Sequence, residues 1–198
     1  MKADPRSGKT LQRRLDIARA AAAVFRRRGY ASATTEDIAG ALGMTKGSLY
    51  YYFRDKPDIL FFCQNYSLDR LLSEAARIRR SGAPPAARLR DLVRAQMALM
   101  LDELAGTAAH IQTDALDRAR WKRLVLKRDR YEREVRAIVA DGVKKRVFRS
   151  TDPATAARAI LGAVNWTITW FRPGGKRTSE EVAADFSELF VEGLRARR

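Results

Sequence analysis

The chain has 198 residues, of which 46% are hydrophobic and 31% are charged. This length and this share of apolar side chains suffice for a hydrophobic core in one moderate or two small domains, and they exclude a disordered chain. The formal net charge of +16 favours a polyanionic partner, such as nucleic acid or an acidic membrane surface.

The first 14 residues, MKADPRSGKTLQRR, carry five basic residues and one acidic residue. Two interpretations stay open for them. They form a solvated, flexible tail, or they form an arm that follows the minor groove or the phosphates of DNA and adds salt-dependent affinity. Arg13 and Arg14 lie nearest to the folded domain, so they are the DNA contacts that the second interpretation predicts.

Residues 17–25, IARAAAAVF, follow basic residues much as the core of a signal peptide does, but Arg19 interrupts them. Apolar residues recur at helical spacing from Leu11 to Phe25, so we expect a helix and no export signal. No stretch approaches the roughly 20 apolar residues that span a bilayer, and no membrane partner is expected. The single cysteine, Cys63, excludes an intramolecular disulfide and suits a reducing, cytoplasmic location.

Residues 34–56, TTEDIAGALGMTKGSLYYYFRDK, have the spacing of two short helices joined by a tight turn. Thr34 can cap the first helix in a reciprocal box with Asp37, and Thr45 can begin the second. Gly43 stands at the turn, where a residue without a Cβ adopts the left-handed conformation at no steric cost. In a helix-turn-helix, the first turn of the second helix reaches base edges in the major groove. The pattern therefore predicts base contacts from Lys46, Gly47 and Ser48.

Three consecutive tyrosines, Tyr50, Tyr51 and Tyr52, continue the second helix. They point about 100° apart, so they cannot all face one groove, and we expect at least one to pack inward. Tyrosine hydroxyls and the ammonium of Lys56 can donate to phosphate oxygens, which positions a helix without reading sequence. We assign Tyr50 to phosphate, leave the orientation of Tyr51 open and expect Phe53 in the core.

This segment resembles the DNA-binding domain of the tetracycline-repressor (TetR) family of bacterial one-component regulators. The resemblance rests on TTEDIA, LGMTKGSLYYYF and the lysine that follows, and the length and helical pattern extend it to the whole chain. It implies an N-terminal helix-turn-helix domain over residues 1–56, and a helical effector-binding and dimerisation domain over residues 57–198. It implies double-stranded operator DNA as a partner, with contacts from Thr34, Thr35, Lys46, Ser48, Tyr50, Tyr52 and Lys56. Tyr52 stands where the family usually has histidine, so a phenol replaces an imidazole there.

Beyond Lys56 the pattern predicts helices throughout and no strand, so the expected fold class is all-α. Asp55 can cap a long helix over residues 56–80, which SGAPP at 81–85 ends. Further helices are expected up to about residue 104, over about 107–116 and 118–145, over 153–170 behind Asp152, and over 179–195 behind a box of Thr178 and Glu181.

The last two of these helices each have an apolar face. The faces comprise Ala157, Ile160, Leu161 and Val164 on one helix, and Val182, Phe186, Leu189, Phe190 and Gly193 on the other. A monomer can bury both faces internally. The TetR resemblance implies instead that they pair with their copies in a second chain as a four-helix bundle. A symmetric dimer presents two readers to a near-palindromic site, so we expect a homodimer.

Residues 165–175, NWTITWFRPGG, resemble the corresponding region of a TetR branch that includes acyl-CoA-responsive repressors of steroid-ring, fatty-acid or aromatic-acid degradation. This resemblance implies a small-molecule effector, with an acyl-CoA thioester as the best candidate. Trp166 and Trp170 share one helix face and either wall a pocket or fill the core, and the core is the favoured interpretation. Asn165 beside them needs a hydrogen-bond partner if it is buried.

Residues 117–149 contain 13 basic residues against 5 acidic ones. Such a run on a long helix is usually a solvated face, which is the favoured interpretation. The alternative is that Arg120, Lys127 or Arg130 attracts the phosphates of coenzyme A, a task that suits arginine. Met97, Met100, His110 and Gln112 are candidates to line the ligand cavity, although His110 suits a satisfied core position as well.

His110 is the only histidine and Cys63 the only cysteine, so neither a metal site nor a catalytic pair is supported. No nucleophile motif or phosphate-binding glycine pattern occurs, and we expect no cofactor and no enzymatic activity. The sequence predicts a ligand-responsive transcriptional regulator, best interpreted as a repressor. The alternatives are a TetR-type repressor of an efflux or other operon that senses a non-CoA hydrophobic ligand, and an effector-free architectural DNA-binding protein.

Overall fold

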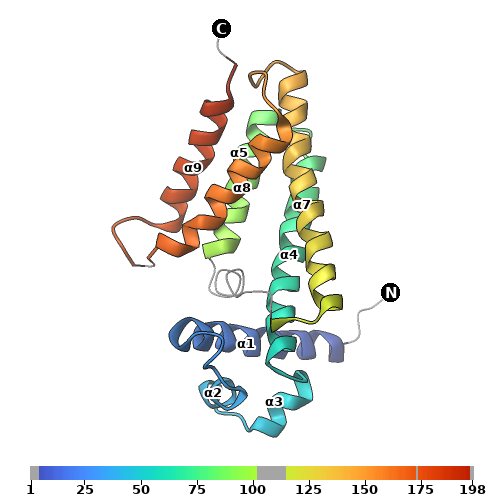
Figure 1. Ribbon diagram of the computed structural model, residues 1–198, viewed down its shortest axis with the longest axis vertical. Coiled ribbons are helices and arrows are strands. Elements are labelled where there is room, and N and C mark those ends of the chain that lie inside the picture. Colours follow the sequence, from blue (N-terminus) through green and yellow to red (C-terminus); the bar gives the residue numbers. More distant parts are fainter. Residues whose placement is uncertain (1–4, 102–114, 173, 197–198) are drawn as a thin grey trace. The chain divides into compact units, whose positions relative to one another are not determined.

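The computed structural model describes residues 5–101, 115–172 and 174–196. Within these ranges the regular structure is helical, and the only β-type pairing is an isolated bridge between Phe148 and Arg195. The expected all-α fold is therefore confirmed. The helices are α1 (Pro5–Arg28), α2 (Thr35–Ala41), α3 (Lys46–Tyr52), α4 (Lys56–Arg80), α5 (Pro85–Leu101), α7 (Arg118–Lys144), α8 (Pro153–Trp170) and α9 (Ser179–Leu194), as Figure 1 shows.

The helix bounds agree closely with the sequence pattern, because most of these helices begin at a local capping signal. Asp152 accepts hydrogen bonds from the backbone at the start of α8, and Thr178 and Glu181 form the expected reciprocal box before α9. At the start of α4, the Asp55 carboxylate accepts from the backbone N–H of Asp58 at 2.6 Å. The helix expected over residues 107–116 lies almost entirely outside the described residues.

The start of α1 differs from expectation. The helix begins at Pro5, so most of the expected flexible tail is helical and continues directly into the first helix of the N-terminal unit. Proline is well suited to the first turn of a helix because its missing N–H has no partner to lose there. The flexible-tail interpretation is wrong from Pro5 onward.

The chain divides into two compact units. The first comprises residues 1–67 with 103–121, and the second comprises residues 68–102 with 122–198, so the division falls within α4 and α7. The first turns of α4 belong with the first unit because Ile59, Leu60 and Cys63 are fully buried there. The Cys63 thiol lies 3.9 Å from the carbonyl oxygen of Ala18 in α1. The domain boundary predicted after residue 56 falls in the first turn of α4. That the residues before and after it have separate functions stays a prediction.

The first unit packs α2 and α3 against α1 (Figure 1). The face of α1 that contacts them carries the apolar residues expected from the sequence, and it is buried from Leu15 onward, whereas Leu11 is exposed. The core also takes one side of each short helix: Ile38 and Ala39 from α2, and Leu49 from α3.

The second unit packs α5 against α8 and α9, which Figure 1 shows side by side. Its core contains Leu89, Leu92, Val93, Met97, Val135, Ile138, Val139, Ala157, Ile160, Val164, Val182 and Val191. Ion pairs at the edges connect α7 to its neighbours. Arg88 of α5 pairs with Asp141, and Arg79 of α4 donates to Glu134 at 2.7 Å.

The end of α7 depends on a glycine. The backbone N–H groups of Val147 and Phe148 both donate to the carbonyl oxygen of Gly142, at 2.9 and 3.0 Å, which folds the chain back over the helix. The Phe148 ring then fills the space above Gly142, where an added Cβ would lie 2.0 Å from a ring carbon. Residues 147–149 also hold the end of α9, because the backbone N–H of Arg149 donates to the carbonyl oxygen of Leu194 at 2.8 Å.

We expect Gly142→Ala to lower the free energy of unfolding by about 1–3 kcal/mol, because Phe148 must leave its buried position to admit the methyl group. Urea unfolding followed by circular dichroism measures the change. Gly40→Ala is the matched control, since Gly40 lies within α2 and an added Cβ meets nothing within 4 Å. That control should leave stability unchanged or raise it slightly. Equal effects of the two substitutions would contradict the packing described for Phe148.

Candidate functional site

Helices α2 and α3 have seven residues each, and helices this short need support from caps and packing. At the start of α2, the Thr34 hydroxyl accepts from the Asp37 N–H at 3.1 Å and the Asp37 carboxylate accepts from the Thr34 N–H at 2.9 Å. At the start of α3, the Thr45 hydroxyl accepts from the Ser48 N–H at 3.1 Å. Gly43 joins the helices with a φ of +60°. The predicted helix-turn-helix is thus confirmed in its local geometry.

One side of α3 anchors the hairpin. Leu49 is fully buried, and Phe53 directly after the helix is 1% exposed, as expected for a core residue. The Phe53 ring meets Phe62 of α4 edge to face, with centroids 5.4 Å apart. These contacts fix the rotation of α3 about its axis, and the rotation decides which of its side chains face outward.

The opposite side of α3 is open to solvent. Lys46, Gly47, Ser48, Tyr50 and Tyr51 are all exposed, and Tyr51 is 81% exposed. Tyr52 is half-buried, with its ring against the edge of Tyr51 at a centroid distance of 5.0 Å. At least one tyrosine was expected to pack inward, and Tyr52 does so in part. The orientation of Tyr51, which the sequence left open, is toward solvent.

Side chains from both helices meet at the edge of this exposed surface. Lys46 forms an ion pair with Glu36 of α2, and the Lys46 ammonium lies 5.8 Å from the centroid of the Tyr50 ring. The Tyr50 hydroxyl is 3.4 Å from the hydroxyl of Thr35. The hydrogen bond from Lys46 lowers the pKa of the Glu36 carboxyl, and the same bond raises the pKa of Lys46. Sequence spacing did not single out Glu36, because this pairing depends on how the two helices cross.

Lys56 faces the interior of the first unit. Its ammonium donates to the carbonyl oxygens of Tyr30, Ala31 and Ala33 at 2.7, 3.2 and 2.8 Å, and it lies 4.5 Å from the centroid of the Tyr30 ring. These three bonds use all three ammonium protons. In this structure the Lys56 ammonium therefore holds the connection between α1 and α2 on the start of α4, and the phosphate contact expected of Lys56 stays a prediction.

Arg14 also turns inward. Its guanidinium carbon lies 4.5 Å from the ring centroids of both Phe53 and Phe62, so the cation contacts both aromatic rings. Arg14 thus packs on the aromatic side chains next to α3, and its expected contact with DNA stays a prediction. Arg13, which is half-buried on the neighbouring position of α1, stays a candidate for DNA binding.

The basic residues proposed for coenzyme A phosphates have carboxylate partners. The Arg120 guanidinium is surrounded by Asp58 at 3.3 Å, Asp117 at 3.5 Å and Asp55 at 3.8 Å, and its side chain is only 16% exposed. Lys127 pairs with Asp69 of α4. A phosphate would have to displace these carboxylates, so Arg120 and Lys127 fit a structural role better than the expected ligand contact. Arg130 is exposed on α7.

A buried polar chain crosses the second unit. The Tyr131 hydroxyl of α7 donates to the Gln96 side-chain oxygen at 3.2 Å, and the Gln96 amide donates to the Asn165 side-chain oxygen at 3.0 Å. Gln96 is 2% exposed, and burial raises the pKa of Tyr131. Asn165 therefore has the partner that a polar side chain at this place requires, although it is itself exposed on α8.

The residues expected to line a ligand cavity are only partly within the described ranges. Met97 and Met100 on α5 are buried, at 0% and 8% exposure. His110 and Gln112 lie outside the described residues. Within the described ranges, no cluster of three or more His, Cys, Asp or Glu side chains could hold a metal ion, and no helix is long and apolar enough to cross a membrane.

The two tryptophans of α8 are on the surface. Trp166 is 63% exposed and Trp170 is 44% exposed, so the favoured core interpretation is wrong. Leu189 of α9 is 67% exposed. Helices α8 and α9 thus carry two apolar faces each, an inner one and an outer one. The inner one contains Ala157, Ile160, Val164 and Val182, which were expected to pair with a second chain but are buried within this one. We call the outer one the α8–α9 apolar face, defined by Trp166, Trp170, Phe186, Leu189 and Phe190.

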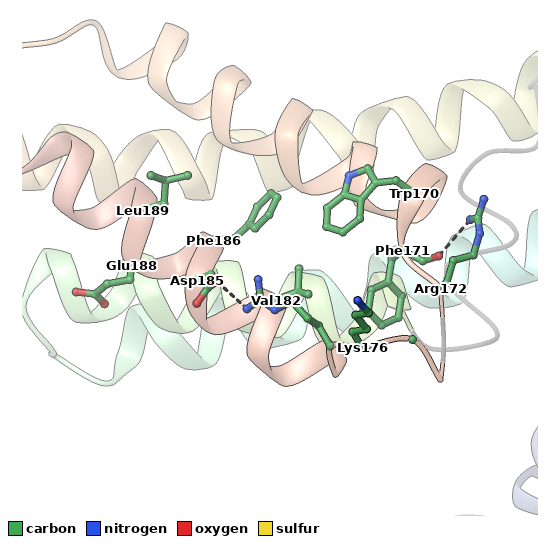
Figure 2. A pocket seen from close by; sticks show the side chains of 11 residues that line it. Trp170, Phe171, Arg172, Lys176, Val182, Asp185, Phe186, Glu188 and Leu189 are labelled. Carbon is green, nitrogen blue, oxygen red and sulfur yellow. Dashed lines mark hydrogen bonds and ion pairs between the residues drawn. The ribbon is translucent and has the colours of Figure 1, made fainter.

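Figure 2 shows the open groove at one end of this face. It has a volume of about 640 Å³ and lies between the end of α8 and the first turns of α9. Trp170 and Phe186 form its apolar floor, with ring centroids 6.1 Å apart. Its charged rim comprises Arg172, Lys176, Arg177, Asp185 and Glu188.

Two family models match this chain. Residues 17–61 match the model of bacterial regulatory proteins of the tetR family, and residues 82–194 match the model of the tetracyclin repressor-like C-terminal domain. The chain belongs to the TetR family. Because this is a family of regulatory proteins, the expectation of a regulator and not an enzyme is confirmed.

Similar proteins cover nearly the whole chain. The HTH-type transcriptional repressor KstR2 of Rhodococcus jostii (strain RHA1) is 29% identical over 197 residues, 97% of this chain and 95% of the relative. The crystal structure of the TetR-family regulator PfmR from Thermus thermophilus has a TM-score of 0.82 at 32% identity, covering 90% of this chain and 98% of that one. AibR, solved in complex with isovaleryl coenzyme A and operator DNA, has a TM-score of 0.77 at 26% identity, covering 89% and 97%.

We expect Lys56→Met to lower the free energy of unfolding of this TetR protein by about 1.5–3 kcal/mol, because three carbonyl oxygens lose a charged donor. Thermal and urea unfolding measure the effect. Lys9→Met is the matched control, since it removes the same charge from an exposed position of α1. If Lys56→Met weakened DNA binding without affecting stability, Lys56 would be a phosphate contact after all.

Proposed function

We propose that this TetR-family protein is a transcriptional repressor that binds operator DNA as a homodimer and leaves it when a small-molecule effector binds. The observation that carries the proposal is the asymmetry of α3. Leu49 is fully buried, whereas Lys46, Ser48, Tyr50 and Tyr51 on the remaining surface are exposed at the start and along the outer side of the helix. A helix held in this way is ready to enter a major groove without refolding.

Within this proposal, the exposed residues divide by chemistry. Lys46, Gly47 and Ser48 lie in the first turn of α3, where side chains reach base edges. The tyrosine hydroxyls and the threonines at the start of α2 donate to phosphates, which sets the register of the protein on the duplex. The proposed phosphate contacts are Thr34, Thr35, Tyr50, Tyr51, Tyr52 and Arg13.

The α8–α9 apolar face supports the homodimer. Contiguous exposed aromatic and aliphatic side chains are unfavourable in water and mark contact surfaces. Gly162 of α8 and Gly193 of α9 are exposed, with open space where a Cβ would stand, so a second helix can approach closely at both positions. A two-fold pairing of this face with its copy forms a four-helix bundle. It also relates the two α3 helices by the same symmetry that relates the half-sites of a near-palindromic operator.

Leu189→Glu should dissociate the dimer, because the 67% exposed Leu189 side chain lies in the proposed interface and a paired copy would bury two carboxylates. Sedimentation velocity at micromolar protein measures the change. Leu126→Glu is the control, since Leu126 is 57% exposed on α7 and does not belong to the α8–α9 apolar face. We expect a monomer for Leu189→Glu and a dimer for Leu126→Glu. A dimer in both variants would place the interface elsewhere.

For the effector, we propose an acyl-CoA thioester. The support is the similarity over 89% of this chain to AibR, solved with isovaleryl coenzyme A and operator DNA, together with the similarity to KstR2. The net charge of +16 also favours an anionic effector over a cationic one. Of the candidate phosphate contacts, Arg130 is an exposed residue of α7, whereas Arg120 and Lys127 are held by carboxylates.

Release follows from differential affinity. An effector that binds best to a conformation in which α4 has shifted, and in which the two recognition helices no longer match successive grooves, lowers operator affinity by the ratio of its affinities for the two states. Such a regulator acts where the chromosome lies, in the bacterial cytoplasm.

The test is binding to DNA from upstream of the protein's own gene at fixed salt, with random-sequence duplex in parallel. A panel of acyl-CoA thioesters and their free acids is then added. We expect operator affinity to fall about 5- to 150-fold with at least one thioester and not with its free acid. Specific binding that no thioester disturbs would exclude this effector class and favour another hydrophobic ligand. Equal binding to random DNA would favour an architectural DNA-binding protein.

A further inference from the structure

Glu36 is the acidic residue closest to the reading side chains of α3, and its surroundings are more specific than those of an ordinary surface carboxylate. One of its carboxylate oxygens pairs with the Lys46 ammonium. The other accepts from the Thr35 hydroxyl at 3.1 Å. Thr35 in turn lies 3.4 Å from the Tyr50 hydroxyl, and Lys46 lies over the Tyr50 ring. These four side chains form a closed ring of contacts between α2 and α3.

This ring contributes little to folding. The side chains of Glu36 and Lys46 are 56% and 48% exposed, and exposed ion pairs contribute little to stability. The hairpin is held instead by the caps at Thr34 and Thr45 and by the buried Leu49. A carboxylate on the surface that meets a polyanion is also unfavourable for affinity, since it repels phosphates. The position of Glu36 beside Lys46 is explained if this ion pair affects which DNA sequences the protein binds.

The chemistry of the pair suits selective reading. On random DNA, an unpaired lysine at the start of a recognition helix contacts any phosphate, because this contact needs charge alone. Lys46 held by Glu36 must first give up that partner. In the major groove of a G·C pair, the guanine O6 and N7 accept from a lysine, so the right base can replace the Glu36 carboxylate as the partner of Lys46.

We infer that Glu36 is a specificity-determining residue that positions Lys46 and withholds it from the phosphates of random DNA. The inference rests on the proposed function, because it assumes that α3 reads an operator. Glu36 acts through Lys46, so removing its charge changes discrimination between sequences more than it changes affinity for the operator.

The test compares Glu36→Gln with the wild-type protein on its upstream DNA and on random duplex, from about 50 to 200 mM salt. We expect binding to random DNA to tighten about tenfold, with a salt slope steeper by about 0.9 for each new phosphate contact, or about 1.8 for a dimer. Operator affinity should change less, so the ratio of the two dissociation constants falls. An unchanged ratio would overturn the inference.

Two controls isolate the pairing. Glu74→Gln removes the same charge from α4, where Glu74 accepts from Arg77 at 2.8 Å, and it should leave discrimination unchanged. In a Lys46→Gln background, Glu36→Gln should lose most of its effect on the ratio. An equal effect in both backgrounds would show direct repulsion of DNA by the carboxylate and overturn the positioning role. If the wild-type protein did not prefer its upstream DNA to random duplex, the proposed function would fail. If the wild-type protein were selective and Glu36→Gln left the ratio of the two dissociation constants unchanged, only the role of Glu36 would be refuted.

Discussion

Helices α2 and α3 are too short to be stable alone, and this constraint governs how the first unit is built. Their stabilising contacts lie on one side: the caps at Thr34 and Thr45, the buried Leu49 and Phe53, and the lysine that fixes the α1–α2 connection, Lys56. The other side is exposed, and its contacts with α2 include the Lys46–Glu36 ion pair and the approach of Tyr50 to Thr35. A surface that is rigidly presented and yet unused in folding is available for a partner, and in a TetR protein that partner is expected to be DNA.

The high positive charge does not by itself locate this surface. Several basic side chains that the sequence offers for DNA or for coenzyme A are occupied inside the protein: Lys56 by carbonyl oxygens, Arg14 by two phenylalanine rings, and Arg120 by three aspartates. Each bridges segments distant in sequence. The exposed hydroxyls of α3 and the Lys46–Glu36 pair between α3 and α2 are therefore more informative about recognition than the charge count.

The sequence predicts what local interactions determine. The bounds of α4 and α8, the left-handed Gly43 and the box of Thr34 with Asp37 follow from residues within a few positions of one another. The partners of Lys56 lie 23 to 26 positions away, so no local pattern indicates them. The helical spacing of Trp166 favours the core, and yet this residue is exposed, because apolar periodicity indicates that a helix has an apolar face but not whether its own chain covers that face.

The most direct test of a symmetric dimer with two α3 readers is a hydroxyl-radical footprint of the protein on its upstream DNA. The account predicts two protected patches related by a near-palindrome, with centres one helical turn of about 34–36 Å apart or a multiple of it. A single protected patch, or uniform protection along the duplex, would contradict the paired readers on which the proposed repression depends.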